Sequence, residues 1–215
     1  MSTVGVIDYG MGNLHSVAKA LERVADGTRV VVSSDPKVLL RAQRLVLPGV
    51  GAIRDCMGEL RRLGLDDVTR RAAEDRPLLG VCVGLQALMD FSAENDGTQC
   101  LGLVPGKVSF FADVLAPKLG TEHLKIPHMG WNQVHQVGEH PLWQGVTQDE
   151  RFYFVHSYFV EPASADLVAA TSSYGVTFCA AVARDNVFAV QFHPEKSQHA
   201  GLALYRSFLS WDGTT

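Results

Sequence analysis

The first half of the chain alternates short apolar runs with segments of helical periodicity. The apolar run at residues 4–7 predicts a strand, and Asn13 is placed to cap a helix whose apolar positions recur on one side through Ala25. The alternation then continues, with strands expected at 29–32, 44–47 and 78–81 and helices at 55–74 and 84–91. Such βαβ units predict a central, mostly parallel sheet with helices on both faces.

The second half of the chain is richer in strand-like segments. They lie at residues 107–111, 130–137, 152–155, 167–171, 179–183 and 187–192, and a helix is expected at 198–211. The turns between these segments are short, which favours additional antiparallel strands. The sequence shows no repeat, linker or low-complexity segment. We therefore expect an α/β fold in which residues 1–215 form a single domain.

Composition and charge narrow the class of protein. Hydrophobic residues make up 47% of the chain and charged residues 20%, which is typical of a globular domain. The formal net charge is -4, and no cluster of Lys and Arg with interleaved aromatic residues points to nucleic acid. No apolar run approaches the roughly 20 residues that span a bilayer. The N-terminus lacks the pattern of a signal peptide, so we expect a cytoplasmic protein without membrane contact.

The four cysteines, Cys56, Cys82, Cys100 and Cys179, have spacings that fit neither a disulfide framework nor a zinc site. We expect Cys56 and Cys179 to fill apolar space, and Cys100 lies in a polar turn region. Cys82 is the exception, because it ends an apolar run and has a glycine two residues away on each side.

The segment Gly80-Val81-Cys82-Val83-Gly84 is typical of a strand, a sharp turn and a helix with a reactive residue at the bend. Glycines relieve crowding where the chain reverses. The N-terminal end of the following helix favours the thiolate form of Cys82, which is the nucleophilic form. The alternative is a buried structural cysteine at a strand end.

His193 and Glu195 follow the last strand and supply a base and an orienting acid. In extended chain, residues two apart project to the same side, so Glu195 is expected to reach the imidazole, with Pro194 resisting helix formation between them. His193 would take the proton of Cys82, and Glu195 would hold the ring. A surface His–Glu pair is the alternative. No third ligand at a recognisable spacing accompanies them, so we expect no metal and no cofactor.

Acyl transfer also needs hydrogen-bond donors for the developing oxyanion. One candidate is the backbone N–H of Val83, which directly follows the nucleophile. The other is the loop at residues 47–51, where glycines allow close approach to a substrate and Val50 would supply the donor. A peptide flip in this loop would create or remove that donor. The alternative for the loop is a plain strand-to-helix turn.

Cys82 in its elbow, followed much later by His193-Pro194-Glu195, resembles the class I glutamine amidotransferases with a Cys-His-Glu triad. Further motifs are similar to those of the glutaminase subunits of imidazole glycerol phosphate synthase, over essentially the whole chain. They are IDYGMGNL at 7–14, LPGVGA at 47–52, KIPHMGWN at 125–132, FYFVHSY at 152–158 and QFHPEKS at 191–197. Val83 and Leu85 stand where that family usually has Leu and Met.

The resemblance implies a flavodoxin-like fold and a glutaminase reaction. Cys82 would attack the side-chain amide of glutamine, giving a glutamyl thioester and ammonia, and water would release glutamate. The residues that the resemblance places around the glutamine are Gly49, Val50, Gly51, Gln86, His156 and Ser157.

The resemblance also implies a partner that consumes the ammonia. This partner is a (β/α)₈-barrel cyclase subunit, with which the chain would form a heterodimer that makes imidazole glycerol phosphate and an aminoimidazole carboxamide ribonucleotide in histidine biosynthesis. The candidates for the partner-facing surface are Asn13, Trp131, Tyr153 and Lys196. Their alternative roles are ordinary packing for the two aromatic residues and a solvated tip for Lys196.

Two other functions remain open from the residues. One is another hydrolase on the same topology, either a cysteine peptidase or a glutaminase that feeds a different synthase, such as the one that makes pyridoxal phosphate. The segment at 125–132 argues against it. The other is a non-catalytic binding subunit, which the presence of all three triad residues disfavours.

Overall fold

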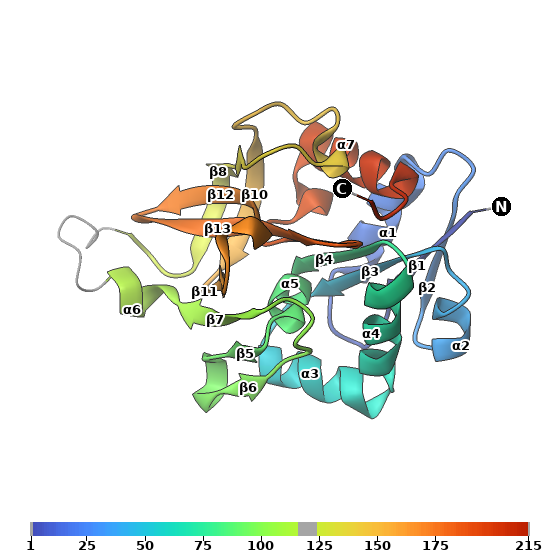
Figure 1. The fold of residues 1–215 in the computed structure, drawn as a ribbon, viewed down its shortest axis with the longest axis horizontal. Helices are drawn as coiled ribbons and strands as arrows, with labels where there is room; N and C mark the ends of the chain where they lie inside the picture. Colours follow the sequence, from blue (N-terminus) through green and yellow to red (C-terminus); the bar gives the residue numbers. More distant parts are fainter. Residues whose placement is uncertain (1, 116–123, 215) are drawn as a thin grey trace.

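The computed structural model describes residues 2–115 and 124–214 (Figure 1). The parallel part of its large sheet has the strand order β2-β1-β3-β4-β14. These strands are β1 (Thr3–Ile7), β2 (Arg29–Ser33), β3 (Arg44–Gly49), β4 (Leu78–Cys82) and β14 (Val187–Val190). Every residue of β4 and β14 is buried, which explains why their sequences are continuous apolar runs.

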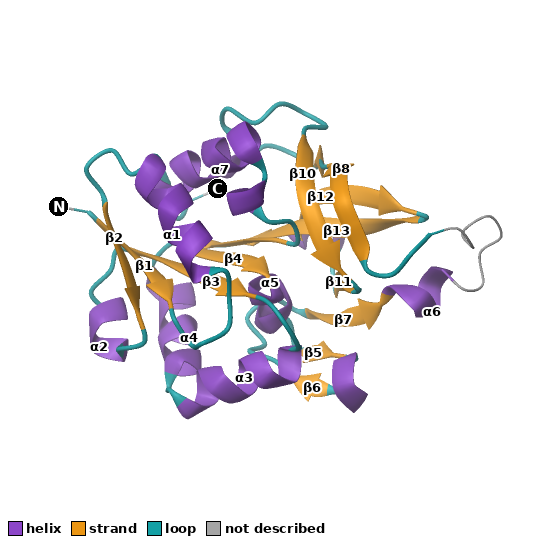
Figure 2. Cartoon of the chain, turned by 180° about the vertical axis from the view of Figure 1, so that it is seen from behind, coloured by secondary structure: helices purple, strands orange, loops and turns teal. Residues whose placement is uncertain are grey.

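Helices cover both faces of this sheet (Figures 1 and 2). One face carries α1 (Leu14–Arg23) and α7 (Gln198–Ser210). The opposite face carries α3 (Ile53–Arg62), α4 (Leu65–Asp75) and α5 (Val83–Leu88), with the short α2 (Pro36–Leu39) near β1 and β2. The predicted parallel sheet with helices on both faces is therefore confirmed.

The second half of the chain extends the sheet mostly through antiparallel pairings, as predicted, and only the pairing of residues 91–92 with 107–108 in this extension is parallel. Beyond β14 the order continues β13-β11-β7-β5-β6, and β12 and β9 join through β13. These strands are β5 (Phe91–Ser92), β6 (Thr98–Gln99), β7 (Gly106–Phe110), β9 (His135–Gln136), β11 (Tyr158–Pro162), β12 (Val168–Tyr174) and β13 (Val176–Arg184). A separate antiparallel pair is formed by β8 (His128–Gln133) and β10 (Arg151–His156).

Several short helices link these strands. They are α6 (Phe111–Leu115) and the 3₁₀ turns η1 (Glu94–Asp96), η2 (Pro141–Trp143), η3 (Ala165–Leu167) and η4 (Pro194–Lys196). The buried apolar residues from the parallel and antiparallel parts belong to one hydrophobic cluster. No helix in the described part of the chain is long and apolar enough to cross a membrane.

Some element boundaries differ from the expectation. The prediction of a single helix at 55–74 is wrong. Gly64 adopts a left-handed conformation with φ of 66° and separates α3 from α4. The strand expected at 130–137 begins earlier, at His128, and is interrupted at Val134 between β8 and β9. The helix expected at 84–91 ends at Leu88, and the last strand ends at Val190 rather than at residue 192.

Candidate active site

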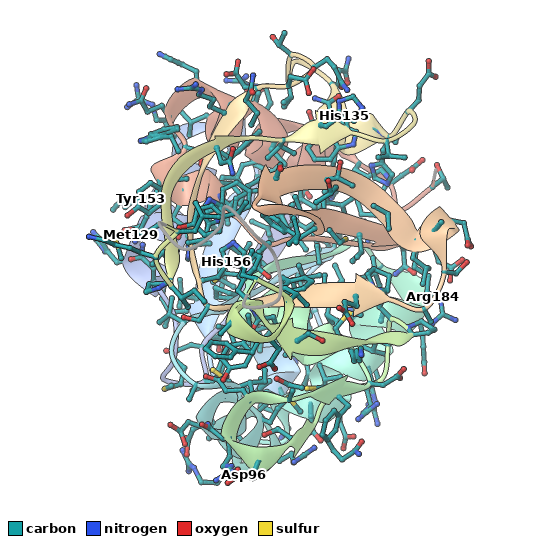
Figure 3. The ribbon with its side chains drawn as sticks, turned by 90° about the vertical axis from the view of Figure 1, so that its left-hand side faces the viewer. Asp96, Met129, His135, Tyr153, His156 and Arg184 are labelled. Atoms are coloured by element: carbon teal, nitrogen blue, oxygen red, sulfur yellow. The ribbon has the colours of Figure 1, made fainter. Side chains whose placement is uncertain are left out.

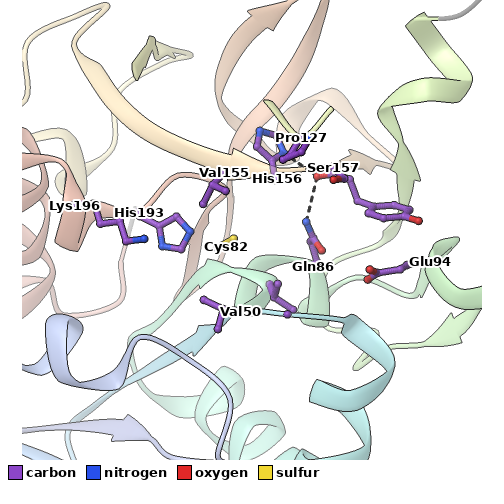
Figure 4. Close-up of a pocket in the computed structure, with 13 residues that line it drawn as sticks. Val50, Cys82, Gln86, Glu94, Pro127, Val155, His156, Ser157, His193 and Lys196 are labelled. Carbon is purple, nitrogen blue, oxygen red and sulfur yellow. Dashed lines mark hydrogen bonds between the residues drawn. The ribbon is translucent and has the colours of Figure 1, made fainter. Parts of the chain in front are cut away.

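A cavity of about 330 Å³ opens where β3, β4 and β14 end at the same edge of the sheet (Figure 4). Carboxyl ends of neighbouring parallel strands are the usual place for a ligand in such sheets. The cavity is lined by Val50, Gly51, Cys82, Val83, Gln86, Glu94, Pro127, Val155, His156, Ser157, Tyr158, His193 and Lys196. Segments far apart in the sequence therefore meet around one cavity.

Cys82 sits at the sharp bend between β4 and α5. Its backbone has φ of 55° and ψ of -110°, a conformation that a residue with a side chain rarely adopts. A backbone strain of this kind costs about 1–3 kcal/mol and persists only where the surrounding structure imposes it. The bend leaves the Cys82 side chain only 4% exposed, at the wall of the cavity.

The two glycines beside Cys82 allow α5 to pack closely on the sheet. A Cβ atom on Gly84 would lie 1.9 Å from the carbonyl oxygen of Leu47, in β3. A Cβ atom on Gly80 would lie 2.9 Å from the Cβ of Ala189, in β14. These glycines thus serve close packing of the elbow against both neighbouring strands, which is a stricter requirement than the relief of crowding expected from the sequence.

His193 and Glu195 form a buried pair beside the cavity. The imidazole Nδ1 lies 2.8 Å from Oε1 of Glu195, and the two side chains are only 2% and 1% exposed. The extended geometry expected between them is wrong, because residues 194–196 form the 3₁₀ turn η4 that brings the carboxylate back to the ring. The side chain of Asn13 reaches the same oxygen, with Nδ2 3.4 Å from Oε1. Asn13 therefore occupies the N-cap position of α1 without capping it through its side chain.

The second ring nitrogen of His193, Nε2, is buried and makes no hydrogen bond to any described residue. The Cys82 sulfur lies next to the ring in the cavity (Figure 4). Burial alone would lower the pKa of His193, but the neighbouring Cys82 sulfur and the Glu195 carboxylate outweigh it and raise this pKa well above its ordinary value. The arrangement favours an imidazolium beside the sulfur.

Gln191 belongs to the site although it was not a predicted site residue. It is fully buried just after β14, and its Nε2 lies 3.8 Å from the Cys82 sulfur. Its Oε1 accepts a hydrogen bond from Nε2 of Gln86 at 3.3 Å. A glutamine at the end of an apolar strand, two residues before His193, is the one signal in the sequence that could have indicated it.

Gln86 and His156 both hold the carbonyl oxygen of Tyr158, at the cavity wall. Gln86 Nε2 donates to it at 3.2 Å and His156 Nδ1 at 2.8 Å (Figure 4). His156 Nε2 in turn lies 2.9 Å from Nδ1 of His128. Ser157, between these wall residues, also faces the cavity. The wall around residues 156–158 is therefore fixed by side chains from three different elements.

The tautomers of the two histidines follow from their partners. Asn132 donates through Nδ2 to the Ser173 carbonyl at 2.8 Å and to His128 Nε2 at 3.2 Å, so His128 carries its proton on Nδ1. Nδ1–H of His128 then donates to His156 Nε2. Burial lowers the pKa of His128 to about 4 and that of His156 to about 3, so both rings are neutral at neutral pH.

Glu94 is a further cavity residue that was not predicted. Its carboxylate faces the cavity from η1, and Oε2 accepts a hydrogen bond from the backbone N–H of Ile53 at 2.9 Å (Figure 4). Val50 and Gly51 line the cavity as expected, whereas Gly49 is buried behind them. A Cβ atom on Gly49 would lie 2.7 Å from the Tyr9 hydroxyl and 2.8 Å from the Gly84 nitrogen.

The remaining predicted residues lie on β8, β10 and η4, and of these only Lys196 lines the cavity. Trp131 and Tyr153 are opposite one another on β8 and β10, with ring centroids 6.2 Å apart and nearly perpendicular planes. The ammonium group of Lys196 lies 5.6 Å from the centre of the Tyr153 ring, a cation–π contact. Figure 3 shows Tyr153 and the exposed Met129 together at one edge of the molecule.

The other cysteines differ from Cys82 in their surroundings. All four cysteines are free, and Cys56, Cys100 and Cys179 are buried in the core; Cys100 lies in the loop after β6, as expected, but its side chain points into the core. Burial raises the pKa of Cys56 and of Cys100 to about 11 and that of Cys179 to about 12. These thiols are therefore poor nucleophiles. Within the described residues, no group of His, Cys, Asp and Glu side chains could hold a metal ion.

Comparison with known sequences places the chain among characterised families. The family described as glutamine amidotransferase class-I matches residues 5–210. The chain is 59% identical over 213 residues to imidazole glycerol phosphate synthase subunit HisH 1 of Pseudomonas aeruginosa, covering 99% of both chains. It is 57% identical over 215 residues to the HisH subunit of Nitrosococcus oceani, covering 100% of both.

Solved structures share the fold at much lower sequence identity. A structure of a glutamine amidotransferase has a TM-score of 0.71 at 20% identity, covering 96% of this chain and 97% of the other. A structure of PurLQS from Thermotoga maritima has a TM-score of 0.70 at 20% identity, covering 97% and 98%. These likenesses confirm the predicted amidotransferase fold.

Proposed function

The chain belongs to the class I glutamine amidotransferases and, within them, to the HisH subunits of imidazole glycerol phosphate synthase, and from this premise we propose that Cys82, His193 and Glu195 hydrolyse glutamine. The observation that carries the proposal is the buried pair of His193 Nδ1 and Glu195 Oε1, 2.8 Å apart. The other ring nitrogen, Nε2, has no hydrogen-bond partner among the described residues and lies beside the Cys82 sulfur. A ring held by a carboxylate on one nitrogen and facing a nucleophile with the other is the arrangement of acyl-transfer triads.

The reaction follows from the proton positions. With the proton on His193, the Cys82 thiolate attacks the side-chain carbonyl carbon of glutamine and pushes its electron pair onto the oxygen. The imidazolium then gives its proton to the amide nitrogen, the C–N bond breaks, and ammonia leaves a glutamyl thioester. Water attacks the thioester, His193 takes a proton from the water, and glutamate departs as the Cys82 sulfur is released.

The oxyanion of both tetrahedral intermediates needs backbone donors. Val83 begins α5 directly after the nucleophile, and Val50 lines the cavity from the end of β3. Their N–H groups are the donors in this proposal. Loss of one such donor costs about 3–4 kcal/mol of transition-state stabilisation in comparable enzymes.

The cavity wall supplies the contacts for the rest of the substrate. Gly49, Gly51, Gln86, His156 and Ser157 form or support this wall in the proposal. Glu94 gives the cavity a carboxylate that can pair with the α-amino group of glutamine. A Glu94→Gln variant should raise KM for glutamine, with a smaller effect on kcat.

The ammonia is consumed by a separate cyclase subunit, with which HisH subunits form imidazole glycerol phosphate synthase in histidine biosynthesis. Ammonia has to reach that subunit without protonation in bulk water, so the cavity should open toward the partner. Lys196 lines the cavity and contacts Tyr153, which packs against Trp131, so the partner surface is proposed at this rim, with Asn13 beside the triad.

Two further points belong to the proposal. Residues 1–215 act as one amidotransferase domain, which is supported by the single hydrophobic cluster and by the family match over residues 5–210. A cytoplasmic location is supported by the biosynthetic role of the relatives.

The test compares glutamine-dependent and ammonia-dependent synthesis by the complex with the cyclase. Cys82→Ala should abolish the former and leave the latter intact, because only the glutaminase step uses the thiol. Glutamine hydrolysis should also be slow without the cyclase and its nucleotide. Loss of both synthetic activities in an intact complex would refute separate sites. Labelling by a glutamine-like diazo-ketone that persists in Cys82→Ala would refute the nucleophile, and absence of labelling would favour a non-catalytic subunit.

A further inference from the structure

Two buried side chains outside the triad form hydrogen bonds to the backbone of residues 47–51, here called the oxyanion loop. The hydroxyl of Tyr9 donates a hydrogen bond to the carbonyl oxygen of Pro48 at 2.7 Å. The thiol of Cys56, in α3, donates to the carbonyl oxygen of Val50 at 3.4 Å. The peptide that carries the Val50 N–H lies between these two carbonyls in the chain. Both of its neighbouring peptides are therefore tethered, one by each side chain.

Both donors are buried and permanently protonated. Tyr9 is 1% exposed and Cys56 is 0% exposed. Burial raises the pKa of Tyr9 well above its ordinary value, with a further contribution from Cys56, and burial raises the pKa of Cys56 to about 11. A protonated phenol and a protonated thiol remain hydrogen-bond donors throughout the physiological pH range.

The backbone between Pro48 and Gly51 packs closely against the protein on one side and is exposed to the cavity on the other. Gly49 is pressed between the Tyr9 hydroxyl and the start of α5, where a Cβ atom would lie 2.9 Å from the Cβ of Val83. Val50 is 37% exposed at the cavity, and Gly51 has φ of 87°. The Gly49–Val50 peptide has no such tether from a side chain among the described residues.

We propose that Tyr9 and Cys56 are positioning residues that fix the Pro48 and Val50 carbonyls and thereby confine movement of the oxyanion loop to the Gly49–Val50 peptide. The inference rests on the proposed glutaminase function and deepens it. Rotation of one peptide between two fixed neighbours switches the Val50 N–H between a pointing-in and a pointing-out position. Cys56, expected from the sequence to be an apolar filler, thus acts through its S–H group.

The test uses three variants in the complex with the cyclase and its nucleotide. Tyr9→Phe and Cys56→Ala each remove one tether with little change of volume, and Cys56→Ser keeps a donor at the same place. Without a tether, the loop samples more conformations and the Val50 donor is aligned less often. We expect kcat for glutamine hydrolysis to fall about tenfold, a fraction of the loss from deleting a donor, while KM for glutamine changes less than about twofold. Cys56→Ser should retain most of the rate.

Cys179→Ala is the matched control. Cys179 is also a buried thiol that donates to a carbonyl, that of Ala181 at 3.2 Å, but it lies in β13 and outside the oxyanion loop. It should leave kcat unchanged. Alkylation of Cys82 by iodoacetamide, which forms no oxyanion, should proceed at the wild-type rate in Tyr9→Phe and Cys56→Ala. Ammonia-dependent synthesis should also be unchanged, and co-elution of each variant with the cyclase in size-exclusion chromatography shows that the variant is folded and assembled.

The proposal is overturned if kcat is unchanged in both Tyr9→Phe and Cys56→Ala, or if Cys56→Ser loses as much rate as Cys56→Ala. It is also overturned if alkylation of Cys82 slows in parallel with hydrolysis, because the nucleophile rather than the loop would then be affected. A wild-type complex that fails to hydrolyse glutamine refutes the proposed function itself, and is recognised before any variant is compared.

Discussion

At the scale of single residues, the most unusual feature is the backbone of Cys82. Its φ of 55° is imposed by the junction of a fully buried strand with a helix that packs on β3. The strain gives the sulfur a fixed position at the cavity wall and lowers the stability of the fold. In the proposed mechanism, the position that Cys82 needs as nucleophile and the stability of the fold are therefore opposed.

Replacing Cys82 by glycine should stabilise the protein relative to Cys82→Ala, and both variants should lack glutaminase activity. Alanine keeps the steric conflict of a Cβ atom at positive φ, and glycine removes it. We expect Cys82→Gly to exceed Cys82→Ala by about 1 kcal/mol in the free energy of unfolding, measured by urea denaturation. Equal stabilities, or a less stable glycine variant, would show that the elbow carries no strain.

The chemistry-bearing residues were visible in the sequence because each follows an apolar strand. Cys82, His193 and Glu195 could be named for that reason, and the structure brings them together at one sheet edge. Gln191 could not be singled out, because its role depends on a contact with a sulfur 109 residues away in the chain. Asn13 was expected as a helix cap, but a tertiary contact with Glu195 takes its side chain instead.

At the scale of elements, the turn η4 depends on its packing against α7. A Cβ atom on Gly201, in the first turns of α7, would lie 1.8 Å from the carbonyl oxygen of Pro194. The Pro194 carbonyl belongs to the turn that presents Glu195 to His193. The backbones of α7 and η4 therefore pack directly against each other, with no room for a side chain at Gly201.

Gly201→Ala should consequently lower glutaminase activity by displacing η4. We expect kcat to fall about 100-fold, as for other small displacements of a catalytic group, and stability to fall as well. Gly58→Ala is the control, because Gly58 is exposed in α3 and a Cβ atom there meets nothing within 4 Å. That variant should keep full activity and gain about 0.5–1 kcal/mol in stability. A fully active Gly201→Ala variant would show that the position of η4 does not depend on close packing against α7.

The strand pair β8 and β10 carries His128 and His156 on its buried side. These two histidines make the stability of the fold sensitive to acid. Both histidines have a lower pKa in the folded protein than in the unfolded chain, so the unfolded chain binds more protons as the pH falls below about 6.5. Their contribution to stability is present in full above that pH and is lost as the pH falls toward about 4 and about 3.

We expect each of these histidines to lower the free energy of unfolding by about 2 kcal/mol as the pH falls from about 7 to about 5. Urea unfolding at these pH values measures the loss. His128→Phe should be less stable at neutral pH, because it deprives His156 of a partner, but its stability should depend less steeply on pH. His199→Ala, an exposed substitution, should keep the wild-type pH dependence. If the stability of His128→Phe depended on pH as steeply as that of the wild type, His128 would not be a source of the acid sensitivity.

The elements themselves were predictable to different degrees. The strands of the parallel core were found because burial on both faces makes them continuous apolar runs. The break at Gly64 could have been recognised from a glycine after the last apolar residue of a helix. The strand β11 was missed because it follows β10 with a single residue between them and ends at Pro162, so no alternating pattern marks it. Such short elements depend on pairing with distant strands.

At the scale of the whole molecule, two of the most exposed apolar residues lie close together on β8. Met129 is 62% exposed and Trp131 is 44% exposed on β8, and Lys196 borders them across Tyr153. Large exposed aromatic residues beside a functional cavity are typical of a protein–protein interface. The position fits a partner that receives ammonia directly from the cavity.

Trp131→Ala should therefore weaken binding of the cyclase subunit. A loss of about 2 kcal/mol, typical of an aromatic hot spot, corresponds to a Kd about 30-fold higher. Isothermal titration calorimetry of the two subunits measures it. Val32→Ala removes an equally exposed apolar side chain, 42% exposed on β2, and should leave Kd unchanged. Equal affinities of wild type and Trp131→Ala would place the interface elsewhere.

The position of β14 has a consequence for the order in which the chain is made. This strand is inserted between β4 and β13, so the two halves of the sheet stay unjoined until residues 187–190 leave the ribosome. Until then β4 has one unpaired apolar edge, and Cys82 lacks its proposed base, His193, which follows β14 in the chain. A chain that stops before Val187 should therefore aggregate, and it should hydrolyse no glutamine.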